Sequence, residues 1–172
     1  EWSAAVGIGA RESTVGTTPE SLSATIKGEY PWGRQWPPAK GAGNYADEDC
    51  KQRFPAEKTI EGYSDGFAAT APVMSFPPNE LGICDLGGNV WEWCEDWFNA
   101  EKKEHVFRGA SWGSSAREPL LSSYRAPQTS DRRWRNDGFR CVLADAQTPS
   151  TDASAAVSAL APKAMSSTPA TA

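Results

Sequence analysis

Proline and glycine interrupt this chain at short intervals between Tyr30 and Asn79. The interruptions fall at Pro31, Gly33, Pro37, Pro38, Gly41, Gly43, Pro55, Gly62, Gly66, Pro72, Pro77 and Pro78. Because these residues end helices and disturb strands, no regular element of ordinary length fits between them. Long irregular segments in a compact domain are usually functional, or are held by other means such as bound ions. The sequence therefore predicts a loop-rich fold.

Composition supports this interpretation and excludes some classes of partner. The 172 residues are enough for one domain with a core. Eight Trp, 15 Gly and 13 Pro indicate large aromatic anchors and tight turns rather than a helical bundle. A formal charge of −5 argues against a general nucleic-acid binder. No stretch approaches the ~20 apolar residues of a membrane span, so we expect no membrane insertion.

A few short elements are expected between the turns. Thr18-Pro19-Glu20-Ser21 has the composition of a helix start, with Pro early and Glu in the first turn. Alternation of side chains predicts a strand at 90–93. β-branched and aromatic residues beside glycine predict strands at 106–108 and 139–143. The Ala, Ser, Thr and Pro composition of residues 146–172 predicts a disordered tail, because such a segment buries too little apolar surface to fold.

The four cysteines are widely spaced, at Cys50, Cys84, Cys94 and Cys141, with no CxxC pair. This spacing argues against a tetrathiolate zinc site. Free thiols and two disulfides both remain open, since four cysteines allow three pairings.

Three groups of motifs stand out along the chain. They are Tyr30-Pro31-Trp32-Gly33 with Gly41-Ala42-Gly43-Asn44-Tyr45-Ala46-Asp47, then Gly82-Ile83-Cys84-Asp85-Leu86-Gly87-Gly88-Asn89-Val90-Trp91-Glu92-Trp93, then Arg108-Gly109-Ala110-Ser111-Trp112 with Asp137-Gly138-Phe139-Arg140-Cys141. In this order they resemble the formylglycine-generating enzyme (sulfatase-modifying factor) family. The resemblance implies an α+β, C-type-lectin-like fold, low in regular secondary structure, over residues 1–145. It also implies that the first strand and main helices of a full domain lie upstream of Glu1.

The same resemblance implies two calcium sites, and calcium prefers six to eight oxygen ligands. In the first, carboxylates come from Asp47 and Asp65, and carbonyls from Glu48 and Phe67. In the second, carboxylates come from Asp85 and Glu92, and carbonyls from Gly88 and Val90. The alternative for the first is an ordinary Asp-Gly turn. The alternative for the second is a glycine turn before a strand, although a carboxylate between two tryptophans needs a partner.

The family's copper chemistry is not expected here. The resemblance places its two copper-binding thiols at Ser114 and Pro119, and a hydroxyl does not replace a thiolate for Cu(I). His105 is the only histidine, so we expect neither a histidine-ligated metal site nor a histidine-based catalytic triad.

By the same resemblance, residues 113–118 and 126–136 fill the place of the family's active-site face, and they are polar and basic. Trp with Arg is the side-chain mixture of binding hot spots, and we predict a ligand surface there. The predicted ligand-binding residues are Trp112, Ser114, Arg117, Arg132, Arg133, Trp134 and Arg135. A solvated loop around a buried Trp is the alternative. Arg140 is assigned to a structural ion pair and left out of the site. A polar segment rich in Arg and Trp, flanked by the family motifs, also resembles the variable proteins of diversity-generating retroelements.

Three functions follow from these features. The first is a non-catalytic module that binds a protein, peptide or glycan, with an anionic partner favoured by the arginines. The second is an oxidoreductase of the formylglycine-generating type, or an enzyme with different chemistry. The third is an accessory domain of a larger enzyme or kinase.

Overall fold

The computed structural model describes residues 1–12 and 16–143, and its helices are short. They are α1 (Trp2–Ala5), η1 (Gly9–Arg11), η2 (Glu20–Leu22) and α2 (Glu48–Arg53). The helix start predicted at 18–21 is confirmed only as the single 3₁₀ turn η2, which begins after Pro19. Within the described residues, no helix is long and apolar enough to cross a membrane.

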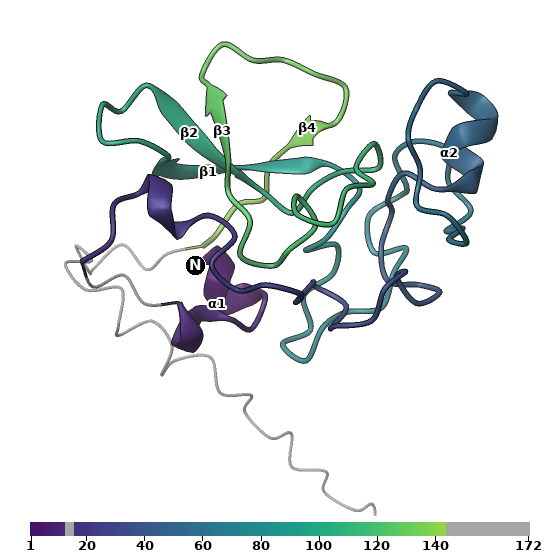
Figure 1. Cartoon of the computed structure of the whole chain (residues 1–172), viewed down its shortest axis with the longest axis horizontal. Coiled ribbons are helices and arrows are strands. Elements are labelled where there is room, and N and C mark those ends of the chain that lie inside the picture. The colour runs from purple at the N-terminus through teal and green to yellow at the C-terminus, as the bar shows by residue number, and fades with distance from the viewer. Residues whose placement is uncertain (13–15, 144–172) are drawn as a thin grey trace, which may run out of the picture. The chain divides into compact units, whose positions relative to one another are not determined.

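A four-stranded mixed sheet is the main regular element (Figure 1). Its order is β3-β2-β1-β4, with β1 at Trp91–Trp97, β2 at Glu104–Arg108, β3 at Ala126–Thr129 and β4 at Asp137–Gly138. The pairs β1–β2 and β2–β3 are antiparallel, whereas β4 runs parallel to β1. The sheet is therefore one hairpin with a strand added at each edge.

Aromatic pairing fixes the register of the central hairpin. Trp93 lies opposite Phe107, and their rings meet edge to face at 4.1 Å. Such cross-strand aromatic pairs stabilise a sheet beyond their buried area. The register shifts between Trp93 and Trp97, where β1 is irregular.

The predicted strands differ from the observed ones at several places, since β2 begins at Glu104 rather than Val106 and β3 was not predicted. The strand expected at 90–93 continues to Trp97, because β2 supplies partners along that length. The strand expected at 139–143 is wrong: pairing ends at Gly138, and Phe139 is 74% exposed. In place of a ladder partner, Arg140 directs its side chain to Glu92.

Irregular segments far apart in the sequence are joined by a buried asparagine pair. Asn44 and Gly88 form a bridge, and the Asn89 amide donates to the Asn44 carbonyl at 2.8 Å. The Asn89 side chain bonds both backbone groups of Ala71, at 2.9 and 3.2 Å. A Cβ on Gly88 would lie 2.2 Å from the Asn44 oxygen, so this approach requires glycine. These bonds hold the proline- and glycine-rich segment, whose only named helix or strand in the described structure is the short helix α2.

The same segment contributes many of the core side chains. Residues 1–141 form one compact unit. Tyr45 and Tyr63 are buried in the core, and Trp32 packs against Tyr45 and stacks on Tyr30 at 4.7 Å. The fold is α+β and low in regular structure, as predicted. The tail predicted at 146–172 lies outside the described residues.

Candidate functional site

A groove of about 740 Å³ lies on the sheet beside the loop that joins β3 to β4. Its floor comes from β1 and β2 and its rim from the loop. It is lined by Trp93, Cys94, His105, Ser130, Arg132, Arg133, Trp134, Asp137, Gly138 and Phe139. The volume is within the usual range of ligand pockets.

Trp134 stands at this rim with its ring 65% exposed. Its backbone is held, since the Trp134 amide donates to Asp137 Oδ2 at 3.1 Å. The same oxygen accepts from Arg132 Nε at 3.1 Å, and the Arg132 guanidinium lies 4.6 Å from the Trp134 ring centre. A charge-assisted bond and a cation–π contact therefore position an exposed tryptophan.

Arg133 is exposed and donates only to carbonyls, those of Ser130 at 2.8 Å and Arg132 at 2.6 Å. In the described part of the chain, no carboxylate forms an ion pair with it. The Thr129 hydroxyl, and Arg133 to a lesser degree, hold the pKa of Asp131 below its ordinary value. Arg133 is thus the groove cation whose charge remains open to a ligand.

The other predicted ligand residues do not line the groove. Trp112 is 4% exposed, so it is a core residue rather than a surface contact. Arg135 lies over it and over Phe54, at 5.0 and 4.9 Å. Ser114 Oγ accepts from the Ser111 amide at 3.1 Å, and Arg117 stacks on Trp36 at 4.8 Å. Trp112, Arg135 and Arg117 are thus engaged in cation–π contacts outside the groove, and Ser114 in a hydrogen bond.

The first predicted calcium loop brings its two carboxylates together. Asp47 is fully buried and caps α2 by accepting from the Cys50 amide at 2.9 Å, while its other oxygen accepts from the Asp65 amide at 2.6 Å. Burial raises the pKa of Asp65 to about 7, and Asp47 adds to this effect. Glu48 is exposed, and Phe67 donates its amide to Asp65. Within the described residues neither carboxylate forms an ion pair, although each of the four oxygens accepts a backbone amide, with Tyr45 donating to Asp65 Oδ2 at 2.9 Å. The pair therefore offers oxygen ligands to a cation without a competing cationic side chain.

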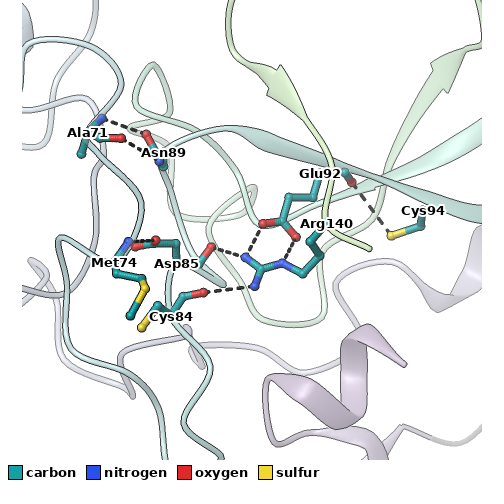
Figure 2. A network of polar contacts seen from close by, with 8 residues as sticks. All are labelled: Ala71, Met74, Cys84, Asp85, Asn89, Glu92, Cys94 and Arg140. Carbon is teal, nitrogen blue, oxygen red and sulfur yellow. Dashed lines mark hydrogen bonds and ion pairs between the residues drawn. The ribbon is translucent and has the colours of Figure 1, made fainter. Parts of the chain in front are cut away.

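The second predicted loop is organised around Arg140 (Figure 2). Arg140 bonds both oxygens of Glu92, with Nε to Oε2 at 2.6 Å, and donates to the carbonyls of Cys84 at 3.1 Å and Asp85 at 2.8 Å. The structural ion pair predicted for Arg140 is confirmed. Glu92 therefore has a partner without a metal.

Asp85 and the two carbonyl residues of this loop remain as further oxygen sources. Asp85 accepts from the Met74 amide at 2.6 Å through Oδ2, while its Oδ1 is buried without a hydrogen-bond partner. Gly88 is buried and Val90 half-buried next to it. The loop fits calcium through Asp85 but not through Glu92 as it is bonded here. Across residues 1–12 and 16–143, no three His, Cys, Asp or Glu side chains form a metal cluster.

All four cysteines are free thiols, which is one of the two alternatives that the sequence left open. Burial raises the pKa of Cys94, in the groove, to about 11, and this thiol is neutral. Ser114 and Pro119 stand at the positions expected for copper-binding thiols.

Sequence reasoning missed the part of the groove that comes from the sheet. Trp93 and His105 lie on neighbouring strands, with ring centres 6.1 Å apart. The alternation of Trp91 and Trp93 was the available signal, but it indicates a core face as readily as a binding face. Phe139 was assigned to a strand and is instead exposed at the rim.

Comparison with known proteins identifies the relatives of this chain. Residues 1–145 match the family described as sulfatase-modifying factor enzyme 1-like domain. An inactive C-alpha-formylglycine-generating enzyme 2 from Bos taurus is 35% identical over 131 residues, covering 72% of this chain and 40% of that protein. A formylglycine-generating enzyme from Thermomonospora curvata is 34% identical over 113 residues, covering 65% and 32%. The chain thus spans two fifths or less of these relatives.

Among solved structures, Treponema denticola variable protein 1 is similar, with a TM-score of 0.49 and 21% identity. The match covers 70% of this chain and 42% of that one.

Proposed function

Because the chain belongs to the sulfatase-modifying factor enzyme 1-like family, we propose that it uses the family's α+β, C-type-lectin-like scaffold as a non-catalytic ligand-binding module. The observation that carries the proposal is Trp134, which is 65% exposed yet held in place by Arg132 and Asp137. Tryptophan and arginine dominate binding hot spots, and a preorganised side chain loses little entropy on binding.

The non-catalytic part of the proposal rests on two positions. Ser114 and Pro119 stand where the resemblance places copper-binding thiols, and neither side chain is a thiolate. Overall similarity does not separate the alternatives, since an enzyme and a relative described as inactive are 34% and 35% identical. The residues at the site therefore decide between them.

The ligand we propose is a protein, peptide or glycan with negative charge. Arg133 offers an unpaired guanidinium on a protein whose formal charge is −5. An anionic group would gain a charge-assisted hydrogen bond there, and the neighbouring tryptophan would add apolar contact. A retroelement variable protein would use the same face, and that interpretation predicts sequence differences among close relatives over residues 113–136.

We further propose that calcium supports the loops at residues 44–67 and 85–92. Buried Asp47 and half-buried Asp65 supply hard oxygen ligands, and Asp85 Oδ1 supplies another in the second loop. Bound calcium would neutralise the carboxylates and tie the loops to the core.

The test of the binding function is a screen of peptide and glycan libraries against the full 172-residue chain. Trp134→Ala should weaken binding of a captured ligand by more than ~1 kcal/mol and leave folding intact. The matched control is Trp91→Ala, which removes a ring packed against Phe107 and Tyr124 and should cost ~3–5 kcal/mol of stability. Ligands that bind wild type and Trp134→Ala equally would refute the proposed face.

A further inference from the structure

The walls of the groove are aromatic, and two of them are open to solvent. Phe139 is 74% exposed and Trp134 65% exposed, and both line the groove together with Trp93. The Trp93 ring is fixed by an edge-to-face contact with Phe107, with 4.1 Å between the ring centres. Exposed apolar side chains gathered at one concave place indicate an interaction site. The groove therefore accepts a flat apolar group.

Several side chains that line the groove are polar, and two of them pair with each other. Asp137 is 7% exposed at its side chain and bonds Arg132, and the Cys94 thiol is neutral. The Arg133 guanidinium on the rim has only carbonyl partners. The groove thus combines an apolar floor with one guanidinium, that of Arg133, which can pair with a ligand.

We infer that the groove binds a peptide segment carrying an aromatic side chain next to a carboxylate, an inference that rests on the proposed binding function. The aromatic ring packs between Trp134 and Phe139, and the carboxylate bonds Arg133. A guanidinium and a carboxylate are complementary in charge and in fork geometry. The volume of about 740 Å³ holds such a pair of side chains.

A glycan fits the groove less well. A sugar ring stacks on tryptophan, but its hydroxyl groups also require several hydrogen-bonding partners. Ser130, His105 and Arg133 are the polar side chains not already held by an ion pair there, and the His105 ring lies 3.3 Å from the Glu95 carbonyl. Unpaired hydroxyl groups in an apolar groove cost binding free energy. The acidic aromatic peptide is therefore the favoured ligand.

The test uses three short probes with the full chain: acetyl-Glu-Phe-Glu-amide, its Gln-Phe-Gln analogue and its Glu-Ala-Glu analogue. Affinities are measured by calorimetry or by NMR shifts at low salt. The first probe should bind about tenfold more tightly than either analogue, the gain expected of one charged hydrogen bond or one buried ring. Arg133→Gln should remove the preference for Glu over Gln, and Arg133→Lys should keep part of it.

Phe139→Ala should weaken the two Phe-containing probes alike. The control is Arg34→Gln, an exposed arginine outside the groove whose partner is Glu29. It should change no affinity. Melting curves for each variant show that it is folded.

Equal binding of the three probes, or none, would overturn the inference. So would an acidic sugar such as sialyllactose that binds in their place and is lost in Trp134→Ala, although the binding function would then stand. The binding function itself fails only if no library ligand depends on Trp134.

Discussion

Replacing Arg140 by methionine should destabilise the protein strongly, because one guanidinium holds three groups. Glu92 is 6% exposed and both its oxygens bond Arg140, which also donates to the carbonyls of Cys84 and Asp85. Removing one partner of a buried ion pair costs ~3–5 kcal/mol. Since the Arg140 side chain is 34% exposed, water can partly solvate the abandoned carboxylate. We therefore expect about 3 kcal/mol, the low end of that range.

The assay is urea denaturation of wild type, Arg140→Met, Glu92→Met and the double variant. Because the second substitution removes the carboxylate that the first leaves unpaired, the double variant should be less destabilised than the sum of the two. A coupling free energy of ~1–3 kcal/mol is expected for groups in one network. Arg34→Met serves as control, since its exposed pair with Glu29 contributes ~0–1 kcal/mol.

Two results would refute this reasoning. The first is an Arg140→Met variant that loses less than ~0.5 kcal/mol, the range of ordinary surface substitutions. The second is strict additivity in the cycle. Repeating the cycle with calcium and with chelator separates the roles of the two cations. If calcium rather than Arg140 holds Glu92, the loss should appear only in chelator.

Three further outcomes are expected. Chelator should lower the melting temperature, because calcium at a hundredfold excess over its Kd adds about 2.7 kcal/mol to the free energy of unfolding. If calcium occupies the first loop, Asp65→Asn should remove most of this difference, and a melting curve unchanged by chelator would exclude calcium. With Ser114 and Pro119 in place of thiols, the chain should form no aldehyde on a cysteine-containing sulfatase peptide, and an aldehyde in its mass spectrum would refute this. Arg11 and Arg34 hold the pKa of Glu29 below its ordinary value, so this carboxylate contributes stability at neutral pH that is lost as pH falls. Between about pH 7 and about pH 3, Glu29→Gln should therefore lose less stability than wild type, as measured by urea midpoints. Equal losses in the two proteins would refute this prediction.

The local parts of the fold could be predicted from sequence. The breakers between 30 and 79 indicated the absence of long elements. Alternation located the first half of β1, and β-branched and aromatic residues beside glycine located the second half of β2. β4 could not be predicted, because a two-residue strand exists only through its parallel partner β1. The strand expected at 139–143 was wrong for the same reason, since composition favours a strand but cannot supply its neighbour.

The candidate site was predictable only where it is continuous in sequence. Arg132, Arg133 and Trp134 are adjacent, so their composition stood out, and the structure places all three in the groove. Trp112 and Arg135 belonged to the same pattern, but they stack on each other at 5.0 Å. Which arginine faces solvent and which covers a ring depends on tertiary contacts that composition does not encode.

The arrangement of the sheet also has a consequence for the order in which the protein folds. β1 and β2 are separated only by residues 98–103, so their hairpin requires the closure of a short loop. Pairing of β4 with β1 must close the much longer stretch 98–136, and long-range closure is slower. We expect the hairpin to form early and the groove to form last. A chain that stalls between these two steps would keep its aromatic hairpin and lack its binding surface.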